Sequence, residues 1–392
     1  MAARTAVRRR LLWPPLLALG LTLATPLPGT LPEAAAQDCS QQATGEELPE
    51  NAGPYPLIEQ LGLRQAWDLA TGEGVTVAVL DSGVDGEHPD LAGAVARGSE
   101  FTVVPEEREF VRTTPDRQRD CPGHGTAVAG MIAAHRAEGD RMTGVAPGAV
   151  VYPIRIADGV DRATPNTLAA AVDDAIAADV DILNLSFAYP VDAEPLRAAV
   201  ARAVDAGVLV VAAAGNEGNE GRDDIPMYPA AYDGVLTVGA VGEDGQPLET
   251  SNAGDWVDLA GYGQELAVAA PGGGYRVEAG TSFATAQVSG AAALVLSRFP
   301  DLTAAQLADR LTESANPVGG GRGERTGAGI VDPFAALTHL DGTAEDPGGE
   351  AAARPGHIPV RPLPEDRPLL SPTAATALGW TGGLLLAVAL GL

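Results

Sequence analysis

The sequence predicts an α/β fold in which a mostly parallel sheet carries helices on both faces. Apolar runs of strand length alternate along the chain with segments that repeat apolar residues at helical spacing. This order is typical of strand–helix–strand units, whose strands lie parallel and whose helices cover the sheet. The predicted strands begin at Val75, Val150, Asp181 and Leu209, and the predicted helices of the series begin at Thr164, Glu194 and Thr303.

Local signals mark the ends of these helices and the segments between them. Pro165 fits the first turn of a helix, where a missing N–H breaks no helical hydrogen bond. Gly207 can end a helix by adopting a left-handed backbone conformation. A regular pattern begins at Leu57, and its Leu61, Leu63 and Trp67 suggest a helix ahead of the first strand. Residues 98–120 are charged and irregular, and we expect a long loop, either functional or disordered, that borders the functional site.

Residues 280–290 combine a turn of small residues with the start of a long apolar helix. Gly280 and Thr281 can turn the chain, and the helical pattern then continues until Pro300 terminates it. Ser282 stands where the helix begins, so its hydroxyl would lie at the positive end of the helix dipole. A nucleophilic serine suits this position, although a serine that only caps a core helix has the same local sequence.

Two further motifs decide between these alternatives. Asp81 follows the predicted strand at residues 75–80, and His124 stands in a Gly-His-Gly-Thr sequence just before a helical pattern. The three motifs, in the order Asp, His, Ser, resemble the catalytic triad of the subtilisin-like serine proteases. The resemblance implies a subtilisin-like fold, peptidase activity, and catalysis by Asp81, His124 and Ser282.

The resemblance also implies residues that bind the substrate and stabilise the oxyanion. Asn216, in an Ala-Ala-Gly-Asn-Glu-Gly segment, matches the oxyanion-hole asparagine of that family, although an asparagine in a turn has the same sequence. The second donor would be the backbone N–H of Ser282. Phe187 is expected in a wall of the substrate cleft, or alternatively in the core. The substrate-binding residues that the resemblance implies are Ser186, Phe187, Ala188 and Gly215.

The N-terminus carries the pattern of a secretory signal peptide. Arginines precede an apolar run over residues 11–24, and three alanines at 34–36 offer a cleavage site. We therefore expect residues 1–36 to direct export. The formal net charge of −27 argues against nucleic acid as a partner. The sequence holds no calcium-loop or zinc-ligand pattern, so we expect no metal and no cofactor, and a structural role for His88.

Cys39 and Cys121 are the two cysteines of the chain. A disulfide between them is the natural expectation in an oxidising compartment, and it would tie the N-terminal extension, residues 37–56, to the loop before His124. Closing so long a loop stabilises a fold by about 4 to 5 kcal/mol in the chain-entropy model. Two free thiols, or a bridge between two chains, are the alternatives.

The peptidase domain is expected to span residues 57–340, and two segments of different composition follow it. Residues 341–372 contain seven prolines and many charges, which indicates an extended linker. Residues 373–392 carry no charged side chain. As a helix with a rise of about 1.5 Å per residue, they would span about 30 Å, enough to cross a bilayer. We expect a single-pass protein of the cell membrane with an extracytoplasmic catalytic domain.

The whole arrangement resembles the mycosins, the membrane-anchored subtilases of type VII secretion. This resemblance implies protein or peptide substrates, and a type VII secretion membrane complex as partner. Two other hypotheses stay open: a general degradative subtilase anchored at the surface, and a structural component of a secretion complex whose peptidase activity is incidental. Neighbouring genes for secretion ATPases would separate the mycosin from the degradative enzyme.

Overall fold

The computed structural model describes residues 44–47, 55–104, 109–115, 119–136, 142–157, 159–218 and 225–339. These residues belong to the first of two units into which the chain divides, Met1–Leu340 and Asp341–Leu392. The predicted signal peptide, Cys39, the linker and the predicted transmembrane helix lie outside the described residues. Within the described ranges, no helix is long and apolar enough to cross a membrane.

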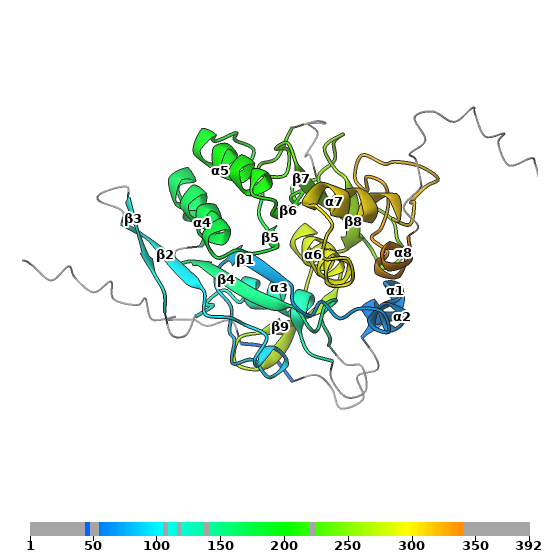
Figure 1. Ribbon diagram of the computed structural model, residues 1–392, viewed down its shortest axis with the longest axis horizontal. Coiled ribbons are helices and arrows are strands. Elements are labelled where there is room, and N and C mark those ends of the chain that lie inside the picture. The colour runs from blue at the N-terminus through cyan, green and yellow to red at the C-terminus, as the bar shows by residue number, and fades with distance from the viewer. Residues whose placement is uncertain are drawn as a thin grey trace, which may run out of the picture. The chain divides into compact units, whose positions relative to one another are not determined.

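An eight-stranded sheet forms the centre of the described unit (Figure 1). The strands are β1 (Thr76–Asp81), β2 (Ser99–Val104), β3 (Glu109–Thr113), β4 (Val150–Ile156), β5 (Ile182–Leu185), β6 (Leu209–Ala213), β7 (Val235–Val241), β8 (Leu259–Tyr262), β9 (Leu266–Ala270) and β10 (Gly274–Glu278). The order in the large sheet is β3-β2-β4-β1-β5-β6-β7-β8. Its neighbouring strands are parallel except β2 and β3, while β9 and β10 form a separate antiparallel pair.

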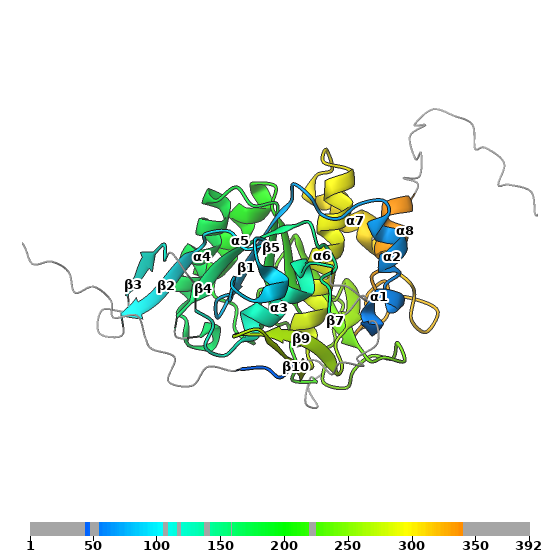
Figure 2. The same cartoon turned by 90° about the horizontal axis from the view of Figure 1, so that it is seen from below.

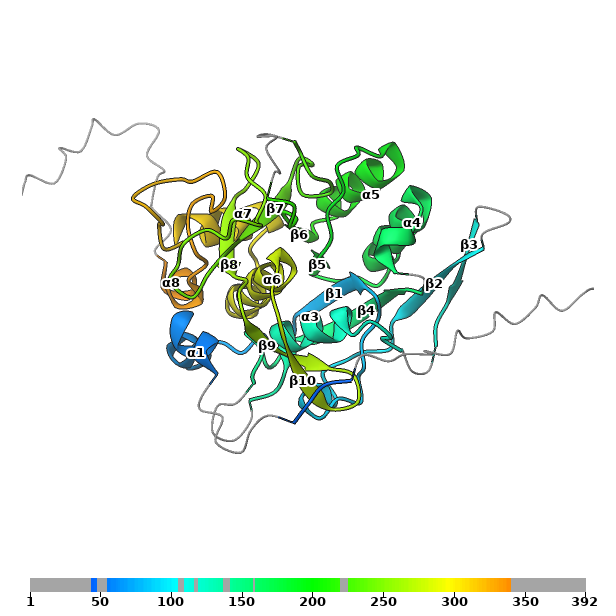
Figure 3. The ribbon, with the colours of Figure 1, turned by 180° about the vertical axis from the view of Figure 1, so that it is seen from behind.

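Helices cover both faces of this sheet, as the views from opposite sides show (Figures 1 and 3). The α-helices are α1 (Pro56–Gln60), α2 (Leu63–Trp67), α3 (His124–Ala133), α4 (Pro165–Ala177), α5 (Glu194–Asp205), α6 (Thr281–Arg298), α7 (Ala304–Glu313) and α8 (Pro333–Thr338), and the 3-10 helices are η1 (Pro89–Leu91) and η2 (Val160–Arg162). Helices α4 and α5 cover one face, and α3 and α6 cover the other. Helices α1, α2 and α8 gather at one end (Figure 2). The predicted α/β class is confirmed.

Strand β1 explains why the central strands are continuous apolar runs. Val77 and Val79 point into the cluster that contains α3 and α6, whereas Ala78 and Leu80 point into the cluster that contains α4 and α5. Successive side chains of a strand face opposite sides of the sheet, so a strand covered on both sides needs apolar residues throughout. The apolar run ends at Asp81, the last residue of the strand, which is buried but lies in neither apolar cluster.

Helix α6 is the central helix of its layer and is buried along most of its length, from Thr281 to Val295. Small side chains permit this close packing, because they let neighbouring backbones approach the helix from several sides. The Gln287 side chain fixes the helix against β8. Its Oε1 accepts the Tyr262 N–H at 2.9 Å, and its Nε2 donates to the Tyr262 carbonyl at 2.6 Å. The start of the helix, which carries Ser282, is thereby held against the sheet.

Two local predictions are wrong. The segment 98–120 is not an irregular loop throughout, because β2 and β3 pair as an antiparallel extension of the sheet. Phe101 and Phe110 supply a shared apolar contact, with ring centroids 5.5 Å apart, and Arg155 pairs with Glu100 at 2.8 Å. The one helix expected in the pattern that begins at Leu57 is instead two short helices, α1 and α2. Gly62, with φ +59°, adopts a left-handed conformation that separates them.

Candidate active site

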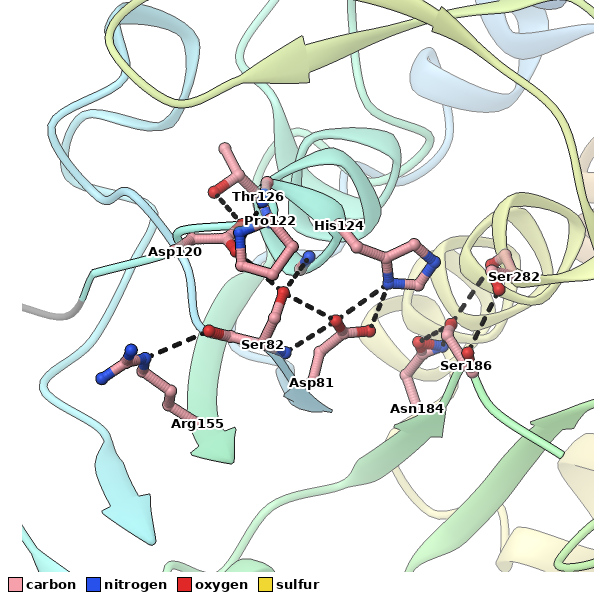
Figure 4. A network of polar contacts seen from close by, with 12 residues as sticks. Asp81, Ser82, Asp120, Pro122, His124, Thr126, Arg155, Asn184, Ser186 and Ser282 are labelled. Carbon is pink, nitrogen blue, oxygen red and sulfur yellow. Dashed lines mark hydrogen bonds and ion pairs between the residues drawn. The ribbon is translucent and has the colours of Figure 1, made fainter. Parts of the chain in front are cut away.

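The four predicted catalytic residues lie at the carboxyl edge of the sheet. Asp81 is the last residue of β1, and Asn216 follows β6. His124 is the first residue of α3, and Ser282 is the second residue of α6. Parallel strands bring their carboxyl ends to one edge of a sheet, which is where such folds bind their ligands. Figure 4 shows Asp81, His124 and Ser282 in this region.

Asp81 and His124 are in direct polar contact. Nδ1 of His124 lies 2.9 Å from each carboxylate oxygen of Asp81, and the Ser82 N–H donates to Asp81 Oδ1 at 2.7 Å. Burial by itself lowers the pKa of His124, but the charge of Asp81 and its hydrogen bond outweigh this and raise the pKa above its usual value. Because Nδ1 carries the proton shared with Asp81, the neutral ring presents Nε2 as a base.

The Ser282 hydroxyl lies beside the wall formed by Ser186. It donates to the Ser186 carbonyl oxygen at 3.1 Å, and the side chain is almost completely buried. A hydroxyl has one proton, so this proton must turn away from Ser186 before His124 Nε2 can accept it. Catalytic hydrogen bonds are often misaligned in the free enzyme and become aligned when substrate binds.

Asn216 is oriented by the residue before the serine. Its Oδ1 accepts the Thr281 N–H at 2.8 Å and lies 3.2 Å from the Thr281 hydroxyl. Since the oxygen is used in this way, the amide presents its Nδ2 group as the donor. Backbone N–H groups in the first turn of a helix have no helical acceptor, and the Ser282 N–H belongs to that turn. The two donors can face the same small anion.

The predicted substrate-binding residues differ in what they contact. The Ser186 carbonyl contacts Ser282 directly. Gly215 has φ +97°, and a Cβ there would meet Ala188 Cβ at 3.1 Å and an Asn252 side-chain atom at 2.5 Å, so only glycine fits. These residues therefore lie together beside the serine. Phe187 is half-buried and packs against the core cluster under α4 and α5, so its place in the substrate wall stays a prediction.

Sequence reasoning missed several charged and polar residues around this centre. The Ser82 hydroxyl lies within hydrogen-bond distance of the carboxylates of both Asp81 and Asp120, and so links Asp120 to Asp81. Arg276 donates to the Pro122 carbonyl at 2.8 Å, and its positive charge opposes the rise of the His124 pKa. The signal available in the sequence was the position of Asp120, four residues before the histidine of a catalytic motif.

Other predicted residues lie away from the centre or outside the described residues. His88 is buried, with Nε2 3.1 Å from the Gly274 carbonyl oxygen, which confirms its structural role. Cys39 is outside the described residues, so its pairing with Cys121 stays a prediction. In the described part of the chain, no group of three or more His, Cys, Asp or Glu residues is arranged to hold a metal ion.

Comparison with known proteins identifies the family. The model of the subtilase family, a peptidase family, matches residues 72–332. This chain belongs to the subtilase family. Subtilisin E of Bacillus subtilis (strain 168) is 40% identical to it over 249 residues, which cover 64% of this chain. The match spans 62% of the length of subtilisin E. The predicted membership of the subtilisin-like serine proteases is confirmed.

Mycosins match a larger part of this subtilase. Mycosin-1 of Mycolicibacterium smegmatis (strain ATCC 700084 / mc(2)155) is 34% identical over an alignment 438 positions long, which covers 97% of this chain and 92% of that protein. The solved structure of the MycP3 protease from the type VII (ESX-3) secretion system has a TM-score of 0.65 at 33% identity, and the match covers 77% of this chain and 93% of that one. The predicted resemblance to the mycosins is confirmed, and so is the subtilisin-like fold.

Proposed function

We propose that this subtilase is a membrane-anchored serine endopeptidase that acts outside the cytoplasm in association with type VII protein secretion. One observation carries the catalytic part of the proposal: both carboxylate oxygens of Asp81 lie 2.9 Å from His124 Nδ1 at the sheet edge that also carries Ser282. A buried carboxylate in this position fixes the tautomer and orientation of an imidazole that must act as a base.

In the proposed reaction, the Ser282 hydroxyl attacks the carbonyl carbon of a peptide bond. His124 Nε2 takes the hydroxyl proton, and Asp81 stabilises the imidazolium that results. When the tetrahedral intermediate collapses, His124 gives this proton to the leaving amine, and an acyl group remains on Ser282. Water, activated by the same imidazole, then hydrolyses the acyl ester and regenerates the serine.

The tetrahedral intermediate carries negative charge on the former carbonyl oxygen, and two donors are available to meet it. We assign these roles to Asn216 Nδ2 and the Ser282 backbone N–H. The bond from Thr281 to Asn216 Oδ1 supports the assignment, because it holds the amide with its donor group free to turn toward the substrate. Ser186, Ala188 and Gly215 would contact the substrate beside the serine, and Phe187 would support that wall from the core side.

A fluorophosphonate probe tests the catalytic proposal without knowledge of the natural substrate. Such probes modify serine hydroxyls that a neighbouring base activates. We expect the full-length exported protein to react with the probe, and peptide mapping to find the adduct on Ser282. An adduct on another residue, or no reaction of a correctly folded protein, would contradict the proposal.

The proposed partner is a type VII secretion membrane complex, and the proposed substrates are proteins or peptides. Support comes from the relatives: a mycosin matches nearly the whole chain, and the related MycP3 is described as a protease from a type VII system. A purely structural role in such a complex is the alternative. Purification of the tagged full-length protein from its own membranes tests the association, which is refuted if no secretion ATPase accompanies it.

We further propose that residues 373–392 anchor the protein in the membrane after residues 1–36 have directed export. The absence of charge over this stretch supports the proposal, because a helix of this length crosses a hydrocarbon core. The full-length protein should therefore stay with the membrane pellet during carbonate extraction, and a chain truncated after Thr338 should be released to the medium in active form. Full-length protein in the carbonate supernatant would show that this segment does not span.

We also propose that Cys121 pairs with Cys39 after export. Cys121 stands beside Asp120 and three residues before His124, so the bridge would tie the N-terminal extension to the loop that leads into α3. Peptide mapping under non-reducing conditions should recover the two cysteines as one linked pair. The variant Cys39→Ser should unfold at a lower temperature, since the open chain gains entropy when it unfolds. Two free thiols in the exported protein would refute the pairing.

A further inference from the structure

A second buried carboxylate, outside the proposed triad, lies at the start of the helix that carries His124. Asp120 is 1% exposed, and both of its oxygens are used as acceptors. Oδ1 accepts from the Ser82 hydroxyl at 2.8 Å and from the Gly123 N–H at 2.8 Å. Oδ2 accepts from the Thr126 N–H at 2.7 Å and from the Thr126 hydroxyl at 2.6 Å. Burial raises the pKa of Asp120 above its usual value, and the hydrogen bonds from Thr126 and Ser82 oppose this rise by stabilising the carboxylate.

Three of these four donors belong to the start of helix α3, namely the Gly123 N–H and the N–H and hydroxyl of Thr126. Gly123 is the residue before the helix, and Thr126 is its third residue, so Asp120 satisfies N–H groups that have no acceptor within the helix. A negative charge at this end also interacts favourably with the helix dipole. The first residue of the same helix is His124. Asp120 therefore holds the backbone from which the catalytic imidazole extends.

The other donor connects Asp120 to the proposed triad. The Ser82 hydroxyl lies 2.8 Å from Asp120 Oδ1 and 3.1 Å from Asp81 Oδ1, and it accepts the Gly125 N–H at 3.1 Å. Figure 4 shows Ser82 between the two carboxylates. The hydroxyl has one proton, which the two carboxylate oxygens share. A change in the charge or position of the Asp120 carboxylate therefore changes how strongly the Ser82 hydroxyl donates to Asp81.

We propose that Asp120 is a positioning residue of the catalytic unit, which holds the start of α3 for His124 and, through the Ser82 hydroxyl, the carboxylate of Asp81. This inference rests on the proposed function, because it assigns Asp120 a task within that triad. Asp120 itself makes no contact with the imidazole in the arrangement described above. It acts through the helix and through Ser82.

The charges near His124 give this arrangement a measurable consequence. Asp81 and Asp120 both raise the pKa of His124, whereas burial and the positive charge of Arg276 lower it. Arg155 lies on the far side of the network, where its Nε donates to the Ser82 carbonyl at 3.1 Å and its guanidinium pairs with Glu100. Serine attack needs the neutral imidazole, so the low-pH limb of the rate profile follows the pKa of His124.

The variant Asp120→Asn removes the charge and keeps the shape of the side chain. Both oxygens of Asp120 accept hydrogen bonds, but an amide has only one oxygen. In the variant, the NH2 group therefore faces N–H or O–H donors on one side, and this repulsion disturbs the start of α3. We expect fluorophosphonate labelling of the full-length protein to slow by about 10- to 100-fold, the scale for a misplaced catalytic group. We also expect the midpoint of the low-pH limb to move to lower pH, because a negative charge that raised the pKa of His124 is gone.

A second variant, Ser82→Ala, separates positioning through Ser82 from general loosening of the fold. It keeps the bonds from Gly123 and Thr126 to Asp120, but it removes the Ser82 donor from both carboxylates and the acceptor of the Gly125 N–H. With less hydrogen-bond stabilisation, Asp81 attracts the imidazolium more strongly, so the midpoint should move to higher pH. The matched control is Asp332→Asn, which removes a carboxylate that caps α8 by accepting the Ala335 N–H at 2.8 Å, away from the site. It should change neither labelling rate nor midpoint.

The inference is supported if the midpoint of the low-pH limb moves to lower pH in Asp120→Asn and to higher pH in Ser82→Ala, and stays unchanged in the control. It is overturned if Asp120→Asn labels as fast as Asp332→Asn with the wild-type midpoint. If Asp120→Asn does not fold, Ser82→Ala decides, and an unshifted midpoint there overturns the proposal. Failure of the proposed function looks different, because the wild-type protein itself would then not be labelled at Ser282.

Discussion

Replacing Ser282 by alanine is expected to lower the rate of peptide hydrolysis by about 10⁵- to 10⁶-fold and to abolish labelling by a fluorophosphonate. Without the hydroxyl, no acyl-enzyme can form, and His124 and Asp81 have no nucleophile to activate. The residual rate would come from binding and from the two oxyanion donors. The measurement is the hydrolysis rate of a protein substrate that the wild-type enzyme cleaves, together with probe labelling of the same preparations.

Ser289 offers a matched control on the same helix. Its hydroxyl is buried in α6 and has no hydrogen-bond partner among the described residues. The variant Ser289→Ala removes the same atom from the same helix, so it should keep wild-type labelling and hydrolysis. Labelling that persists in Ser282→Ala would refute the assignment of the nucleophile, whatever Ser289→Ala does.

The sequence was most informative where one short segment determines both the backbone and the chemistry. A strand that ends in Asp81, a helix that begins at His124 and a glycine turn before Ser282 each have a local signature, and α/β topology brings such strand ends to one edge. The central strands were predictable for a related reason. A strand that is buried on both faces must be apolar throughout.

Predictions were wrong where a distant partner decides the structure of a segment. The charges in residues 98–120 suggested a long irregular loop, but Glu100 pairs with Arg155 and Arg112 pairs with Asp174, so β2 and β3 can join the sheet. No pattern within that segment shows that these partners exist. The same limitation applies in part to Asp120: Gly123 and Thr126 are near it in the sequence, but its link to the triad depends on Ser82, which only the folded chain brings close.

Replacing Asn216 by alanine is expected to lower kcat by about 10²- to 10³-fold and to leave KM nearly unchanged. The amide donor meets an oxyanion that exists in the transition state and not in the bound substrate, so its loss raises the barrier by about 3 to 4 kcal/mol without weakening ground-state binding. Steady-state kinetics on a cleavable protein or peptide substrate measure both constants. A loss of kcat below about tenfold would refute the role of this side chain.

The variant Asn216→Asp distinguishes this donor role from a structural role of the same side chain. A carboxylate can still accept the Thr281 N–H, which Asn216 Oδ1 accepts at 2.8 Å, so the turn before Ser282 stays supported. Its second oxygen, however, brings an acceptor and a negative charge to the place where the oxyanion develops. We therefore expect Asn216→Asp to lower kcat at least as much as Asn216→Ala. If Asn216→Asp instead restored kcat, the side chain would serve the turn and not the oxyanion.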